Sequence, residues 1–101
     1  GVVEDNVRTY ADHWTGTGTI SGAGNAETIC MSSGEFMVSE VVNTGIKTVE
    51  LVQNNYASGD TILIKYRDGV TEAACVAASW ISYTAPFVSA GYAQVRIEST
   101  L

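Results

Sequence analysis

The sequence predicts an all-β domain, and more narrowly an antiparallel β-sandwich of the jelly-roll or immunoglobulin-like type. Hydrophobic residues alternate with polar ones and do not recur at helical spacing. Such alternation is typical of strands with one buried face. Strand-like segments recur about every ten residues between clusters of Gly, Asn, Asp and Ser, a spacing typical of sandwiches. Charged residues make up only 16% of the chain, which suits strands and turns better than surface helices. Because 101 residues suffice for one core, we expect a single domain over residues 1–101.

The first half of the chain contains five segments with strand character. They are Val2–Tyr10, Thr17–Ile20, Thr28–Ser32, Glu35–Val42 and Ile46–Gln53. The second of these is short and lies within Ala11–Glu27, a Gly- and Thr-rich segment that we expect to be a loop. Asn43–Gly45 has the composition of a tight turn, which would join the last two strands.

The second half begins with a polar loop and an alternating strand. The loop is Asn54–Asp60, and the strand is Thr61–Arg67. Within this strand, Ile62, Ile64 and Tyr66 share one face because successive side chains point to opposite sides. We expect these three side chains to face the core.

The next segments are shorter and less regular. Asp68-Gly69 favours a turn, and the small, Ala-rich segment Ala73–Ala78 predicts either a short helix or an irregular crossover. Trp80–Thr84 has the composition of another strand, which Pro86 would end because proline lacks the amide hydrogen that a strand needs.

The last strand shows the clearest alternation in the chain. Ala93, Val95 and Ile97 point to one side, which we expect to be the core. The side chains that point to the other side are polar or aromatic: Tyr92, Gln94, Arg96 and Glu98.

The two cysteines, Cys30 and Cys75, predict one disulfide and hence an oxidising, extracellular location. A bridge across a loop of this length would stabilise the fold by about 4 kcal/mol. The alternative is two separate buried thiols that act as small hydrophobic side chains. The cysteines do not indicate a metal site, because the chain's one histidine, His13, does not complete a ligand set.

Charge and hydropathy argue against nucleic acid and membrane as partners. The formal net charge is −6, and the five Lys and Arg residues are dispersed, so no basic stripe follows a phosphate backbone. No apolar run approaches the roughly 20 residues that a membrane-spanning helix needs. The chain begins at Gly1, and we expect a mature or excised module of a larger protein, acting as a monomer.

The sequence gives little indication of catalysis. His13 lies beside Asp12 in a polar segment, but no nucleophile-elbow motif accompanies it. The glycines of GTGTISGAG lack the strand–turn–helix context of a phosphate-binding loop. We therefore expect a protein that is not an enzyme.

Aromatic side chains are the best candidates for ligand binding. Trp14 has polar neighbours in sequence, which favours partial exposure, although it could instead plug one end of a sandwich. For Trp80 we favour a core position packed on the disulfide, and the alternative is that it faces outward. Tyr92 lies on the polar side of its strand, and Tyr56 lies in an Asn/Ser/Gly loop. With the polar neighbours of Tyr92, the candidate binding residues are Trp14, Tyr56, Trp80, Tyr92, Gln94 and Arg96.

The segment from Ile64 to Ser99 carries a resemblance to a known class of module. The residues that carry it are Tyr66 and Gly69, then Tyr83, Pro86 and Phe87, and finally Gly91–Arg96. This pattern resembles the β-sandwich modules appended to secreted bacterial polysaccharide-degrading enzymes. The resemblance implies a carbohydrate-binding module for plant cell-wall β-glucans such as cellulose or xyloglucan, secreted as part of its parent enzyme. The alternative is a structural or adhesive sandwich that serves as a spacer in a cell-surface, phage or pilus protein.

The resemblance also implies a structural calcium ion. Calcium is bound by clustered carboxylate and carbonyl oxygens, and two segments offer such groups. One is Glu4, Asp5 and Asn6, and the other is Asn54, Asn55 and Asp60. The same residues could instead form turns through local hydrogen bonds.

Overall fold

A computed structural model gives the structure of residues 14–21, 28–50 and 62–100. Its elements are β1 (Trp14–Gly16), β2 (Thr19–Ser21), β3 (Thr28–Cys30), β4 (Phe36–Ser39), β5 (Val42–Gly45), β6 (Thr48–Val49), β7 (Ile62–Gly69), α2 (Glu72–Ala77), β8 (Ile81–Ser82), β9 (Phe87–Val88) and β10 (Gly91–Ser99). The predicted strand Val2–Tyr10 and the loop Asn54–Asp60 lie outside the described residues. The all-β class is confirmed, since strands dominate the described part and α2 is its one helix.

Every strand pairing in the described part is antiparallel. The main sheet has six strands in the order β1-β4-β10-β7-β8, and β5 pairs with β10 beside this path. Two smaller sheets have two strands each, β2-β3 and β6-β9. The described residues thus do not show the broad second sheet of the predicted sandwich, because alternation determines which face of a strand is buried and not how strands divide among sheets.

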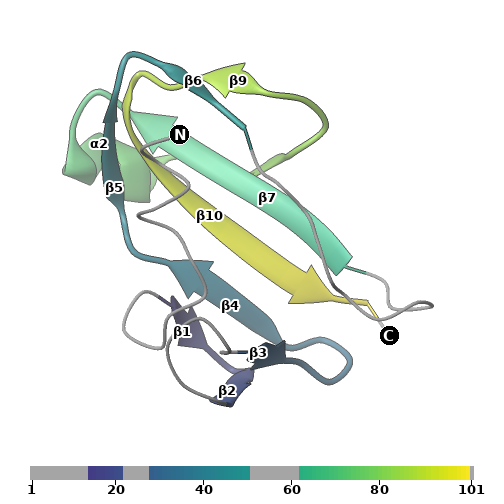
Figure 1. The fold of residues 1–101 in the computed structure, drawn as a ribbon. Coiled ribbons are helices and arrows are strands. Elements are labelled where there is room, and N and C mark those ends of the chain that lie inside the picture. The colour runs from purple at the N-terminus through teal and green to yellow at the C-terminus, as the bar shows by residue number, and fades with distance from the viewer. Residues whose placement is uncertain (1–13, 22–27, 51–61, 101) are drawn as a thin grey trace.

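Strands β7 and β10 form the centre of the main sheet. β7 pairs with β10 along the whole length of β7, from Gly69 opposite Tyr92 to Ile62 opposite Ser99, and Figure 1 shows the two strands crossing the molecule side by side. This register places Ile64 beside Ile97 and Tyr66 beside Val95 on one face. The predicted core faces of both strands therefore coincide.

The core lies against that shared face. Trp14, Met37 and Val95 are buried together, and their packing joins β1, β4 and β10. Partly buried hydrophobic side chains complete this cluster: Ile29, Met31, Ile64 and Ile97. The predicted alternation of the last strand is confirmed, because Ala93 and Val95 are buried while the intervening side chains are partly exposed.

Helix α2 packs directly on β7. Thr71 caps its first turn, since the Oγ1 atom accepts a hydrogen bond from the backbone N–H of Ala74 at 3.1 Å. A Cβ atom on Gly69 would lie 2.5 Å from the nitrogen of Cys75, so glycine is needed for the close approach of helix and strand. The helical alternative for Ala73–Ala78 is confirmed, with bounds one residue earlier.

Three local predictions differ from the structure. The turn predicted at Asp68-Gly69 is wrong, because both residues continue β7 and pair with β10. The turn predicted at Asn43–Gly45 is also wrong, since these residues belong to β5, where Gly45 has a φ of 64°. Strand Trp80–Thr84 is reduced to Ile81–Ser82. At Asp68-Gly69 and Asn43–Gly45, residue types that favour turns thus allow close packing or end a strand, and the chain does not reverse there.

The predicted Cys30–Cys75 disulfide is not present, and both thiols are free. Cys30 is exposed at the end of β3, whereas Cys75 is buried in α2. Figure 1 shows β3 and α2 at opposite ends of the molecule, so the two positions are not arranged for a bridge. The Cys75 thiol instead lies 3.5 Å from the carbonyl oxygen of Arg67, to which it donates a hydrogen bond. The alternative of a buried thiol is therefore confirmed for Cys75 and wrong for Cys30.

In the described part of the chain, no helix has the length and apolar character needed to cross a membrane.

Candidate functional site

The main sheet has a second face, opposite the core, which we call the polar face. It carries Phe36 and Val38 of β4, Leu63, Lys65 and Arg67 of β7, and Tyr92, Gln94, Arg96 and Glu98 of β10. Strand register brings these side chains together, because residues directly opposite in adjacent strands point to the same side. Arg96, for example, lies between Lys65 on β7 and Val38 on β4.

A carboxylate with two cationic partners lies at the β4 side of the polar face. The Glu98 carboxylate accepts from the Arg96 Nε at 2.6 Å and from the Lys65 Nζ at 2.8 Å. These three side chains are each 20–31% exposed. The hydrogen bonds from Lys65 and Arg96 lower the pKa of the Glu98 carboxyl. Glu98 is therefore held in its charged form, which makes it a poor general acid.

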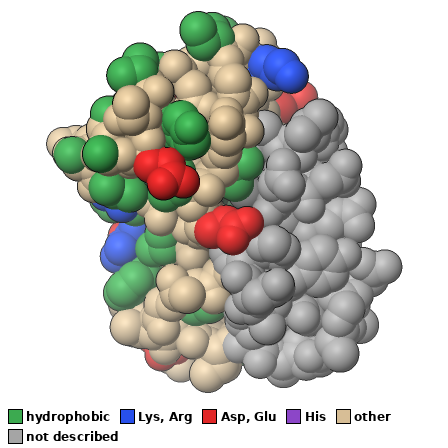
Figure 2. All heavy atoms as spheres, turned by 90° about the vertical axis from the view of Figure 1, so that its left-hand side faces the viewer, with side chains coloured by type: hydrophobic (Ala, Val, Ile, Leu, Met, Phe, Trp, Pro, Cys, Tyr) green, Lys and Arg blue, Asp and Glu red, His purple; other side chains and the backbone are tan. Residues whose placement is uncertain are grey.

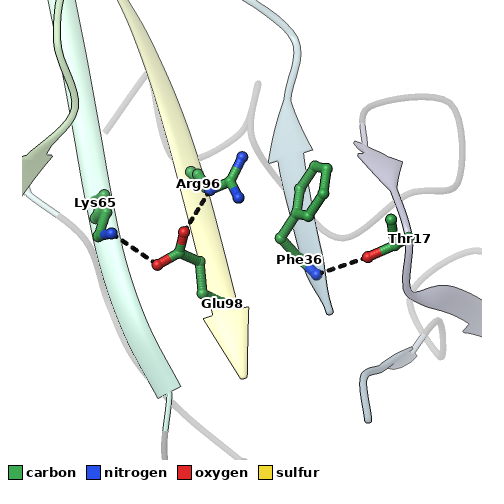
Figure 3. Close-up of polar contacts among 5 residues, drawn as sticks. All are labelled: Thr17, Phe36, Lys65, Arg96 and Glu98. Carbon is green, nitrogen blue, oxygen red and sulfur yellow. Dashed lines mark hydrogen bonds and ion pairs between the residues drawn. The ribbon is translucent and has the colours of Figure 1, made fainter. Parts of the chain in front are cut away.

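An aromatic ring holds Arg96 from its other side. The Arg96 guanidinium lies 3.9 Å from the centre of the Phe36 ring, within the range of a cation–π contact. Phe36 is itself fixed, since its backbone N–H donates to the Thr17 Oγ1 at 3.0 Å. Figure 3 shows Arg96 between Glu98 and Phe36, with its terminal nitrogens directed away from the carboxylate. Its guanidinium is thus oriented in advance of any ligand.

A second fixed guanidinium lies at the α2 side of the polar face. Arg67 stacks on the Trp80 ring at 4.2 Å from its centre. Its Nε donates to the Gln94 Oε1 at 2.8 Å, and its Nη1 donates to the Val76 carbonyl oxygen at 2.9 Å. Gln94 in turn donates through Nε2 to the Ser39 carbonyl oxygen at 2.8 Å. Because the Gln94 amide already has these partners, its role is to position Arg67.

The structure brings four of the six predicted binding residues to the polar face or its border. Tyr92, Gln94 and Arg96 lie on β10, and Trp80 joins them through its contact with Arg67. Trp80 is partly exposed, and it does not pack on a disulfide. The favoured prediction, a core position on the disulfide, is therefore wrong for Trp80, and the outward alternative describes it better.

The prediction that Trp14 is exposed is wrong. Its side chain is 7% exposed and packs with Met37 and Val95 on the core side. The physical reason is strand register: Trp14 pairs with Ser39 of β4, and this pairing turns its ring inward. Its polar neighbour Thr15 points to the opposite side of the sheet. The polarity of the flanking residues therefore does not indicate whether the Trp14 ring is exposed.

The remaining predicted site residues lie outside the described residues. They are Tyr56 for ligand binding, and Glu4, Asp5, Asn6, Asn54, Asn55 and Asp60 for calcium. Within residues 14–21, 28–50 and 62–100, no three His, Cys, Asp or Glu side chains gather as a metal site would require. The calcium site therefore stays a prediction.

Four residues that make these contacts were not predicted as parts of a site: Phe36, Lys65, Arg67 and Glu98. The alternation of Thr61–Arg67 does place Lys65 and Arg67 on the side away from the core. Their partners could not be inferred, because contacts with Glu98 and Gln94 depend on the register between β7 and β10.

Comparison with known proteins identified no relative of this chain. No protein-family model, curated protein or solved structure matches the chain.

Proposed function

We propose that this domain is a non-catalytic carbohydrate-binding module that holds polysaccharide chains on its polar face. The observation that carries the proposal is the group formed by Trp80, Arg67 and Gln94, with Tyr92 on the same face. Sugar rings have apolar C–H faces that pack on aromatic side chains, and hydroxyl groups that pair with fixed donors. Because Arg67 is held by three contacts, a ligand would lose little conformational entropy in using it.

The resemblance of Ile64–Ser99 supports plant cell-wall β-glucans, such as cellulose or xyloglucan, as the first ligands to test. It equally supports a secreted, monomeric module that is part of a polysaccharide-degrading enzyme. With both cysteines free, the secreted location rests on this resemblance.

The experiment is affinity electrophoresis of the domain through gels containing xyloglucan or soluble cellulose derivatives, with retardation as the readout. Trp80→Ala should lose retardation, because it removes the ring and the support for Arg67. Trp80→Phe is the matched control and should keep part of it. Circular dichroism of each variant confirms that the fold is intact. Equal retardation of wild type and Trp80→Ala would remove this face from the proposal.

A structural or adhesive module is the second candidate, and exposed apolar side chains favour it. Ile46, Val70 and Val88 are 79%, 71% and 64% exposed. Ile46 follows Gly45, which pairs with Gly91, and Gly91 lies close to Val70, so Ile46 and Val70 belong to one end of the molecule. Figure 2 shows hydrophobic side chains gathered over the upper part of the described surface. Absence of retardation in every glycan gel would favour this candidate.

A further inference from the structure

The charges of the polar face differ from those of the whole chain. The chain has five Lys and Arg residues against eleven Asp and Glu. The residues of β4, β7 and β10 on the polar face include three cations, Lys65, Arg67 and Arg96, and a single carboxylate, Glu98. Figure 2 shows basic side chains next to hydrophobic ones along the left margin of the described surface. The polar face is thus locally positive on an acidic protein.

The two arginines on this face are fixed in complementary ways. Arg96 donates through its Nε to Glu98 and stacks on the Phe36 ring, and its terminal nitrogens have no oxygen partner within the described part of the chain. Arg67 uses Nε and Nη1 for Gln94 and the Val76 carbonyl oxygen. Since Arg67 lies opposite Gln94 and Arg96 lies two residues further along β10, the two residues occupy diagonal positions of the sheet.

Glu98 does not cancel this positive charge. Its carboxylate is bonded to both Lys65 and Arg96, so two cations share one anion while Arg67 has no carboxylate partner among the described residues. The guanidinium of Arg96 keeps both terminal nitrogens available. Such a guanidinium binds a carboxylate through two parallel hydrogen bonds, which are stronger than hydrogen bonds to neutral hydroxyls. Each guanidinium is stacked on an aromatic ring, which holds it in place before a ligand arrives.

The geometry points to a carboxylate-bearing sugar, such as a uronic acid residue within a polysaccharide, as the preferred ligand of the polar face. This inference rests on the proposed function, carbohydrate binding by the polar face, and names acidic glycans in place of neutral glucans as its preferred ligands. A carboxylate on a sugar ring can pair with the terminal nitrogens of Arg96, whereas a neutral β-glucan offers them only hydroxyl groups. The net charge of −6 disfavours binding of densely charged polyanions. This repulsion is weaker for a polysaccharide whose charges are separated by sugar rings.

The test is isothermal titration calorimetry with three matched soluble probes. They are tetragalacturonate, the same tetrasaccharide with methyl-esterified carboxyls, and cellotetraose. We expect tetragalacturonate to bind at least tenfold more tightly than its methyl ester. Arg96→Gln should remove most of this preference, because it removes the guanidinium and keeps a hydrogen-bonding amide. Lys47→Gln is the control: it also removes one positive charge, but from an exposed residue outside the polar face, and should keep the preference.

Two further probes separate the sugar from other sources of anionic charge. Inorganic phosphate and a tetraglutamate peptide are each titrated alone and as competitors. Weak competition by both supports a site for acidic sugars. Binding of either probe as tight as that of tetragalacturonate overturns the inference in favour of a general anion site or a protein partner.

The failure of the inference differs from the failure of the proposed function. If the methyl ester or cellotetraose binds as tightly as the acid, the acidic preference is wrong and carbohydrate binding stands. If none of the three saccharides binds while circular dichroism shows a folded protein, both are wrong. Thermal unfolding of Arg96→Gln must remain cooperative for its loss of preference to count.

Discussion

At the scale of single residues, Glu98 shows how the polar face is held in place. Its two oxygens are bonded to different cations on neighbouring positions of the sheet, so one carboxylate fixes the side chains of two strands. Since Lys65 and Arg96 lower the pKa of the Glu98 carboxyl, folding favours its ionised form. This contribution to stability is complete above the ordinary pKa of glutamate and is lost as the pH falls through the lower pKa of the folded state.

Glu98→Gln should therefore lower the free energy of unfolding by about 1 kcal/mol at pH 7, as for a partly exposed ion pair. The difference between the variant and the wild type should shrink as the pH falls below 4.5, the usual glutamate value, because the wild-type carboxylate then becomes protonated. Urea denaturation at pH 7, 4.5 and 3 measures this. Glu50→Gln, at an exposed position, should show no such trend. A difference for Glu98→Gln that stays constant over this range would contradict the role given to the carboxylate.

The two cysteines should differ sharply in reactivity. Burial raises the pKa of the Cys75 thiol and keeps reagents from the sulfur atom, whereas Cys30 is exposed. In the native protein, Ellman's reagent should modify one thiol per chain, and the second should react after unfolding in guanidinium. Cys30→Ser should abolish the native reaction and leave the melting temperature unchanged. A native protein without reactive thiols, even with Cys30 in place, would point to a disulfide after all.

At the scale of elements, the contact between α2 and β7 depends on the absence of one side chain. Gly69 lies at the end of β7, where a Cβ atom would come within 2.5–2.8 Å of Cys75 and Ala74. Two of the three closest atoms belong to the backbone of the helix, so the clash cannot be relieved by a rotamer change. The position of α2, and with it the Val76 carbonyl oxygen that holds Arg67, follows from this glycine.

Gly69→Ala should destabilise the fold by about 1–3 kcal/mol, the usual cost of forcing extra volume into a packed contact. The helix should also shift enough to expose the Cys75 thiol, so native reactivity toward Ellman's reagent should rise from one thiol to two. Val70→Ala changes the adjacent, 71% exposed residue and should alter neither stability nor reactivity. If Gly69→Ala matches Val70→Ala in both measurements, the helix does not pack on the strand as described.

The elements that sequence analysis predicted best are those whose signal lies within one segment. The alternation in β10 and β7 identified both strands and their core faces, because the sequence of each strand alone shows which of its faces is apolar. The helix at α2 was one of the two alternatives that the small, Ala-rich residues left open. The burial of Trp14, the free cysteines and the partners of Arg67 depend on register and on distances between elements, which no local pattern specifies.

At the scale of the whole molecule, the two sides of the main sheet have different roles: one contributes to stability, and the other to the proposed binding. The core side holds Trp14, Met37 and Val95, and its packing supplies hydrophobic stabilisation. The polar side holds the guanidiniums and partly exposed rings that the proposed function requires. The two tryptophans lie on different sides of this division, so each one reports on one of the two roles.

Trp14→Ala should cost about 3–5 kcal/mol, a large part of the stability of a single domain, because it leaves a cavity between β1 and β10. Trp80→Ala should cost much less, since its ring is partly exposed and stacks on an arginine that water can solvate. Guanidinium denaturation followed by circular dichroism compares the two variants.

Fluorescence of the single-tryptophan variants then identifies the environment of each ring. Trp80→Phe retains Trp14, whose emission should be blue-shifted and little quenched by acrylamide. Trp14→Phe retains Trp80, whose emission should be quenched more strongly and should change when a glycan binds. If both indoles are equally shielded and neither responds to any saccharide, the division between the two sides fails. Binding would then have to involve residues other than those of the polar face.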